Sequence, residues 1–244
     1  MATKARAALI LAGMEKDPPA RRTRTTTSKA APVAPVDSPR TRDADRSREA
    51  ILAAARDEFA EFGLGGARVD RIAERAAINK KLIYYYFENK DELFRAVLEE
   101  AYLRIREAEQ QLHLADMPPE QAVRRLTEFT WNYYLEHPEF LTLLNSENLH
   151  RARHIKGSER ARALNTPLIE ALGGILERGR ATGVFRGGVD PLQLYISIAG
   201  IAYFYLSNQH TLSTIFGRDL VSPKALSERL SHICDVILGY VLRE

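Results

Sequence analysis

The chain has 244 residues, of which 45% are hydrophobic and 27% charged, a composition typical of globular proteins. Its single cysteine, Cys234, excludes a disulfide framework, a multi-cysteine zinc ribbon and an iron–sulfur cluster. No run of about 18 apolar residues occurs, so no membrane span is predicted. The length allows one or two domains, since domains usually run to about 100–150 residues.

The basic residues are concentrated at the N-terminus. The net charge is +3, but residues 1–42 hold nine lysines and arginines against three acidic residues, so the remainder is nearly neutral. The same stretch holds five of the eleven prolines and no apolar period, which predicts a disordered basic arm over residues 1–44. This arm could follow DNA phosphates or be an inert tail, and Met14 is an alternative start.

Helical periodicity begins after this arm. Apolar residues recur at helical spacing and no segment alternates as a strand does, so the fold class is predicted to be all-α. The first four predicted helices are Ser47–Phe62, Val69–Ala76, Lys80–Phe87 and Lys90–Leu112. Gly63, Gly65 and Gly66 are expected to end the first helix, and Asn79 and Asn89 to cap the third and fourth.

The break at 117–119 separates these helices from about five more. They are predicted over Glu120–Glu136, Pro138–Asn148, Ser158–Thr182, Pro191–Phe216 and Pro223–Leu242. Asp190 and Ser222 each precede a proline, which is the arrangement of a helix cap followed by proline at the first helical position.

The second and third predicted helices are separated by a turn of about three residues, the spacing of a helix-turn-helix. Within KKLIYYYF, Ile83 and Phe87 are expected to face the core, which leaves the lysines and the first two tyrosines to point elsewhere. Such a face suits a DNA major groove, where lysine reaches guanine or phosphate and tyrosine reaches phosphate and thymine methyl groups. The spacing alone fits a small helical hairpin with aromatic packing equally well.

The stretch VDRIAERAAINKKLIYYYFENKDELF resembles the DNA-binding domain of the TetR family of bacterial repressors. The likeness lies in the I-A-x-x-A of Ile72, Ala73 and Ala76, the aromatic cluster ending at Phe87, and Lys90 three residues later. It covers residues 45–95, and the helix count fits the family over 96–244. The resemblance implies a helix-turn-helix domain over 45–92 and an effector-binding and dimerisation domain over 93–244.

The resemblance also implies DNA contacts, residue by residue. They fall on Arg68, Asn79, Lys80, Lys81, Leu82, Tyr84, Tyr85, Tyr86 and Lys90. Two departures stand out: Ala67 and Arg68 replace the threonine or serine that usually caps the second helix, and Ala77 replaces the usual turn glycine.

In this family the last two long helices typically pair with those of a second copy. The candidate interface residues are Leu194, Ile198, Ile201, Tyr205, Leu230, Ile233, Ile237 and Tyr240. A helix that is apolar nearly all round must be buried, although burial inside one subunit is the alternative to a dimer.

The family also implies an effector pocket in the C-terminal helices. The candidate residues are Tyr102, Ile105, Trp131, Tyr134, Phe140, Leu144, Asn145, Asn148, Tyr203 and Asn208, each of which would equally suit core filling or backbone capping. This part looks similar to the branch containing pyrimidine- and nicotinate-responsive catabolic repressors. Glu147, His150 and His154 would share one helical face and could hold a metal, but a solvated face or a loop is favoured and no metal is predicted.

Taken together, these features predict a ligand-responsive transcriptional regulator, most simply a repressor. It would bind a palindromic DNA operator as a homodimer, be released by a small molecule, and work in the cytoplasm at the bacterial nucleoid. No nucleophile–base pair, phosphate-binding glycine loop or H-E-x-x-H motif occurs, so neither an enzyme nor a cofactor is expected. The alternative is a helical DNA-binding or interaction protein without an effector.

Overall fold

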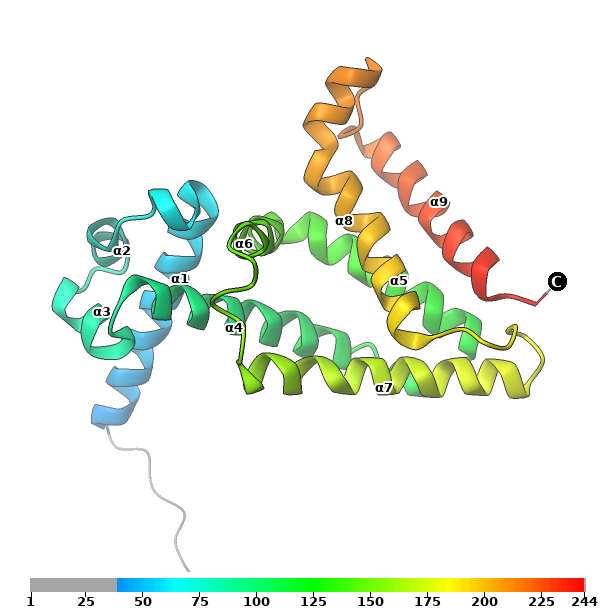
Figure 1. Cartoon of the computed structure of the whole chain (residues 1–244), viewed down its shortest axis with the longest axis horizontal. Coiled ribbons are helices and arrows are strands. Elements are labelled where there is room, and N and C mark those ends of the chain that lie inside the picture. Colours follow the sequence, from blue (N-terminus) through cyan, green and yellow to red (C-terminus); the bar gives the residue numbers. More distant parts are fainter. Residues whose placement is uncertain (1–38, 244) are drawn as a thin grey trace, which may run out of the picture. The chain divides into compact units, whose positions relative to one another are not determined.

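The computed structural model describes residues 39–243, and these form helices joined by short connections (Figure 1). The helices are α1 (Pro39–Gly66), α2 (Val69–Arg75), α3 (Lys80–Phe87), α4 (Lys90–Gln110), the short 3-10 helix η1 (Leu114–Asp116), α5 (Pro119–Glu136), α6 (Pro138–Leu149), α7 (Glu159–Ala181), α8 (Pro191–Phe216) and α9 (Pro223–Val241). Residues 39–243 form no strand, and their one β contact is an isolated bridge between Phe185 and Leu242. The all-α prediction is therefore confirmed for the described part. None of these helices is long and apolar enough to cross a membrane.

The first helix differs from its prediction at both ends. It begins at Pro39, so residues 39–44 are helical and not part of an arm; the rest of that expected arm lies outside the described residues. The Tyr86 hydroxyl donates to the Ala44 carbonyl at 3.2 Å, a tertiary contact that hydrophobic periodicity does not reveal. At the other end Gly63 adopts a φ of 63° and kinks the chain, and helical turns resume as far as Gly66.

The other helix boundaries lie within a few residues of those predicted because local capping sets them. The Asn79 side chain accepts the Lys81 N–H, and Asn89 accepts that of Glu92. Asp190 and Ser222 cap α8 and α9 in the same way, one residue before each proline. All four predicted caps are therefore confirmed.

The core of the helix-turn-helix unit is aromatic and aliphatic. Phe59 of α1 meets Phe94 of α4 edge to face, with ring centroids 5.0 Å apart, and both side chains are fully buried. Ile72 of α2 and Ile83 of α3 are buried in the same cluster. Burial of each such side chain stabilises the folded protein by about 1.5–3 kcal/mol. This shared core therefore helps to hold α2 and α3 in place.

In the larger C-terminal part, α5 packs against α7, α8 and α9, and α4 packs against α7. Trp131 of α5 is 1% exposed and lies against the Tyr205 ring of α8 at a centroid distance of 5.6 Å. This core supports α8 and α9, which lie side by side in Figure 1.

One close approach in this core depends on a glycine. Gly179 of α7 is buried, and a Cβ added there would overlap the ring of Phe185, which is 2% exposed. Gly174 lies on the same helix, but a Cβ there would meet nothing within 4 Å.

We expect Gly179→Ala to lower the free energy of unfolding by about 1–3 kcal/mol, because the Phe185 ring would have to leave its site. The matched change Gly174→Ala should instead be neutral or stabilising by about 0.5–1 kcal/mol, since alanine favours the helix. Urea unfolding of the two variants measures both values. Equal changes in the free energy of unfolding for the two variants would show that the Phe185 ring does not pack tightly against Gly179.

Candidate nucleic-acid interface and ligand pocket

The structure leaves one face of α3 open. Ile83 and Phe87 are buried, whereas the side chain of Tyr85 is 79% exposed and that of Tyr84 43% exposed. Lys80, Lys81, Asn79 and Arg68 are also exposed, and Leu82 is half-buried. The predicted DNA-contacting residues of the turn and of the first turns of α3 are therefore accessible from solvent.

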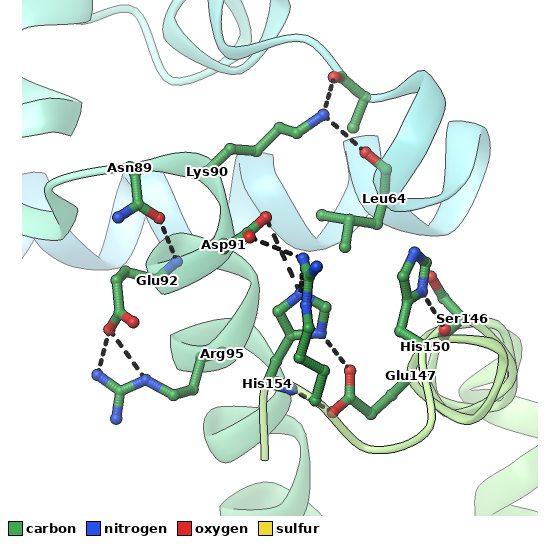
Figure 2. Close-up of polar contacts among 12 residues, drawn as sticks. Leu64, Asn89, Lys90, Asp91, Glu92, Arg95, Ser146, Glu147, His150 and His154 are labelled. Carbon is green, nitrogen blue, oxygen red and sulfur yellow. Dashed lines mark hydrogen bonds and ion pairs between the residues drawn. The ribbon is translucent and has the colours of Figure 1, made fainter. Parts of the chain in front are cut away.

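Two residues predicted to contact DNA make hydrogen bonds within the protein. The Lys90 ammonium donates to the carbonyl oxygens of Leu64 at 2.8 Å and Ala67 at 3.2 Å, so it fastens α4 to the end of α1 (Figure 2). Tyr86 is half-buried, and its hydroxyl donates a hydrogen bond to the Ala44 carbonyl oxygen. In the structure both polar groups are directed into the protein, and the DNA contacts of these two side chains stay predictions.

A buried carboxylate replaces the cap that the sequence lacks before α2. Arg68 makes no side-chain cap, but its backbone N–H donates to Glu58 Oε1 at 2.9 Å. The Arg71 guanidinium donates to the same oxygen at 2.7 Å, and Arg75 lies 3.6 Å from Oε2. Sequence analysis missed Glu58 because its position on α1 reads as one more charged residue.

These contacts also set the ionisation of Glu58. Burial by itself raises the pKa of this carboxyl, but the hydrogen bonds from Arg71 and Arg68 and the positive charges of Arg71 and Arg75 together hold the pKa below its ordinary value. The carboxylate is therefore charged at neutral pH and draws the start of α2 onto α1.

Lys80, at the start of α3, forms an ion pair with Asp70 of α2, with Nζ and Oδ1 2.7 Å apart. The hydrogen bond to Asp70 raises the pKa of Lys80. Asp70 thus places a negative charge beside the exposed face of α3 and orients the lysine across it.

The turn between α2 and α3 contains strain where the family glycine is missing. Ala77 has a φ of 52°, in the left-handed region that favours glycine. The chain adopts the turn nevertheless, with the Ile78 N–H donating to the Ala73 carbonyl at 3.0 Å.

A large cavity lies among α4, α5, α6, α7 and α8, with a volume of about 800 Å³. Six of the ten predicted effector residues line it: Tyr102, Tyr134, Phe140, Leu144, Asn148 and Tyr203. Sequence analysis missed Arg162 and Asn165 of α7 and Tyr195 of α8. The signal on α7 was weak, because its polar residues read as a solvated face and Pro167 interrupts its helical pattern.

The other four predicted effector residues do not line this cavity. Ile105 and Trp131 are each 1% exposed and belong to the core. The Asn145 amide bonds to Ser207 and to the Tyr203 hydroxyl, and Asn208 donates to the Phe204 carbonyl of its own helix.

Two tyrosines of the cavity, Tyr102 and Tyr134, remain neutral hydrogen-bond donors. Burial raises the pKa values of Tyr102 and Tyr134 above the ordinary tyrosine value. Together with Phe140, which stacks on Tyr134 at a ring distance of 5.8 Å, they form aromatic walls with polar tips.

The predicted dimer residues are mostly buried within one chain. Leu194, Ile198, Tyr205, Ile233 and Ile237 are at most 8% exposed, because they pack against α5 and each other. Ile201 and Leu230 are half-buried, and Tyr240 is 42% exposed. The residues that face outward are their neighbours, Leu192, Ile196 and Phe204 on α8 and Val236 on α9.

The predicted metal alternative does not fit the structure. α6 ends at Leu149, so Glu147, His150 and His154 do not share a helical face. Glu147 accepts the backbone N–H groups of His154 and Ile155 at 2.8 and 2.9 Å and meets His154 Nδ1 at 2.5 Å (Figure 2). No cluster suited to a metal ion occurs over residues 39–243.

This segment also reaches the start of α4. Arg153 donates to Asp91 Oδ2 at 2.8 Å, and the His154 ring meets Phe94 edge to face at 5.0 Å. In Figure 2, Asp91 lies between Lys90, which contacts the helix-turn-helix unit, and His154, which Glu147 holds.

The comparisons with known proteins agree with this geometry. Residues 51–97 match the family profile described as bacterial regulatory proteins, tetR family, and residues 119–237 match the tetracyclin repressor-like C-terminal domain. The HTH-type transcriptional repressor NicS of Pseudomonas putida is 42% identical over 199 residues, covering 82% of this chain and 94% of its own. The chain belongs to the TetR family. Its members matched here are transcriptional regulators and not enzymes.

Further relatives extend the match. The HTH-type transcriptional repressor SCO4008 of Streptomyces coelicolor is 38% identical over 108 residues, covering 44% of this chain and 53% of its own. A TetR family transcription regulator from Marinobacter aquaeolei has a solved structure with a TM-score of 0.63 at 19% identity, covering 84% of this chain and all of that chain. The predicted family is therefore confirmed, and the chain is a helix-turn-helix transcriptional regulator of this family.

The two neighbouring tyrosines of α3 provide a matched pair. Tyr85→Phe should weaken binding to operator DNA about fivefold, since its exposed hydroxyl is free to reach a phosphate, and should leave stability unchanged. Tyr86→Phe should leave DNA affinity unchanged and lower the free energy of unfolding by about 0.5–1.5 kcal/mol, since it removes the bond to Ala44. Fluorescence anisotropy and urea unfolding measure the two quantities. The reverse pattern would show that the face of α3 is assigned wrongly.

Glu58→Gln should lower the free energy of unfolding at neutral pH by about 1–2 kcal/mol, a modest figure because Arg71 and Arg75 are partly exposed and water screens them. The folded-state pKa is depressed, so the stabilisation is present above the ordinary glutamate pKa and is lost as the pH falls through the folded value. The deficit of the variant should therefore shrink in acid. Glu61→Gln, which removes an exposed partner of Arg75, is the control and should have little effect.

Proposed function

We propose that this protein is a transcriptional repressor that binds a palindromic operator as a homodimer and is released by a small molecule bound in the large cavity. It would act in the cytoplasm at the bacterial nucleoid. The observation that carries the DNA-binding proposal is the open face of α3, where Lys81, Tyr84 and Tyr85 are exposed while the opposite face is fixed in the core. The likeness to NicS over most of both chains supports repression.

The cavity supports a small aromatic effector. Its volume of about 800 Å³ lies within the range of small-molecule sites, and its tyrosines and Phe140 would stack on a flat ring. Asn148, Asn165 and Arg162 would then orient polar substituents of that ring.

An outward apolar stripe supports the homodimer. Leu192, Ile196 and Phe204 recur along α8 at spacings of four or eight residues, and Val236 and Tyr240 recur on α9. Ile196, and Gly200 one turn further, also line the large cavity, so the stripe borders it. Residues at this spacing share one helix face. Their side chains are 42–59% exposed in the single chain, so a second copy pairing α8 and α9 would cover them.

Selection of DNA fragments by the purified protein tests the proposal. Two recognition helices related by a two-fold axis should select a palindrome with half-sites about 34–36 Å apart, one turn of B-DNA. Selection of no preferred sequence, or of an asymmetric one, would contradict the proposal.

The dimer is tested separately. Phe204→Glu should yield a monomer and weaken operator binding at least about tenfold, since it places a charge in an apolar contact and separates the two recognition helices. Val184→Glu, which changes an exposed residue outside this stripe, should remain dimeric and bind DNA normally. Light scattering and anisotropy give both readouts, and a dimeric Phe204→Glu protein with full affinity would contradict the proposed interface.

A further inference from the structure

The large cavity is closed on one side and open on another. Tyr134 of α5 and Ala161 of α7, which both line it, are only 4% and 7% exposed. Three further lining residues are exposed: Ile196 and Gly200 of α8 and Arg162 of α7. The cavity formed by residues 39–243 of one chain therefore has a mouth, and α8 forms one edge of it.

This edge of the mouth is also part of the apolar stripe on α8. Four positions, each four residues after the last, make up the stripe and the edge: Leu192, Ile196, Gly200 and Phe204. A step of four residues rotates an α-helix by one turn and about 40°, so these positions follow one slowly turning strip along the helix. Whatever covers the stripe must therefore also reach the mouth.

Gly200 leaves a gap in the middle of this strip. A Cβ added there would meet nothing within 4 Å among the described residues, so packing within the chain does not require a glycine. Glycine inside a helix costs about 0.5–1 kcal/mol relative to alanine. The side chains on either side, Ile196 and Phe204, are 51% and 59% exposed. The gap between them gives a neighbouring helix room to approach α8 closely at the mouth.

We propose that a second copy of this chain completes the large cavity. α8 of the second copy lies across Ile196 and Gly200 and supplies the wall that residues 39–243 of one chain leave open. A single interface then removes both the stripe and the apolar edge of the mouth from water. This inference rests on the proposed homodimer and deepens it, because the ligand site is complete only in the dimer.

The accessibility of one thiol inside the cavity tests the proposal. Ala161→Cys places this thiol on a buried wall, close to the start of α7, where a helix N-terminus favours the reactive thiolate. The probe is N-ethylmaleimide, and mass spectrometry follows its addition to the full chain. Native Cys234 is 3% exposed and burial raises the pKa of its thiol, so the wild-type protein gives the slow background.

The thiol should be protected in the dimer and accessible in the monomer. Ala161→Cys should react at least about tenfold more slowly alone than when it is combined with Phe204→Glu or Leu192→Glu, which place a charge in the stripe. Glu74→Cys, on the exposed side of α2, is the control and should react equally fast in both backgrounds. Light scattering at the same protein concentrations gives the oligomeric state.

Three results would overturn the inference. Equal rates for Ala161→Cys in the dimer and the monomer would show that the second copy leaves the mouth open. Protection that persists in the monomer would place the cover within one chain. A dimer that neither charge disrupts would place the interface away from the stripe. The first two results leave the homodimer standing, whereas a monomeric wild-type protein would contradict the proposed function as well, so the two failures are distinguishable.

Discussion

The placement of the recognition helix depends on the buried carboxylate of Glu58. This carboxylate accepts hydrogen bonds from the Arg68 backbone N–H and the Arg71 guanidinium, and it lies 3.6 Å from the Arg75 guanidinium. These contacts hold α2 against α1. α2 in turn sets the turn at Ala77 and the start of α3, where Asp70 orients Lys80. Burying a carboxylate costs free energy, but Glu58 is stabilising here because Oε1 accepts two hydrogen bonds and the charges of Arg71 and Arg75 lie beside it.

α4 connects the helix-turn-helix unit to the large cavity. Its first residue, Lys90, is tied to the end of α1, and Tyr102, one of the cavity walls, lies about 18 Å further along at 1.5 Å per residue. The segment after α6 contacts the same helix through Asp91, and Ser158 contacts Glu99 at 2.7 Å. Residues of α4, α6 and α7 line this cavity, so a molecule bound there as proposed would displace α4, which meets the helix-turn-helix unit.

Much of this architecture follows from local sequence signals. The four helices that follow Asn79, Asn89, Asp190 and Ser222 have a cap that the sequence shows, and their starts were predicted correctly. Tertiary contacts were not readable. Lys90 and Tyr86 have the chemistry of DNA contacts, and only the folded chain shows that their polar ends are already used.

The same limit explains the errors in the C-terminal part. A helix that is apolar on all sides, such as α8, does not reveal which stripe faces its own core, so buried residues such as Leu194 and Ile198 were assigned to the dimer. Four of the six cavity residues that were predicted are aromatic residues that the sequence marks: Tyr102, Tyr134, Phe140 and Tyr203. Arg162 and Asn165 were missed because a polar residue on α7 faces either solvent or a cavity according to packing alone.

The most direct test of the link between the large cavity and the helix-turn-helix unit is the operator affinity of a protein whose cavity is filled. Ala199→Trp places an indole at a position that lines the cavity, and Ala181→Trp places one at the exposed end of α7. Anisotropy titration with the selected operator should show about 5–150-fold weaker binding for Ala199→Trp, the span of typical coupling free energies, and no change for Ala181→Trp. A folded Ala199→Trp protein that binds the operator as tightly as the wild type, or more tightly, would contradict the account.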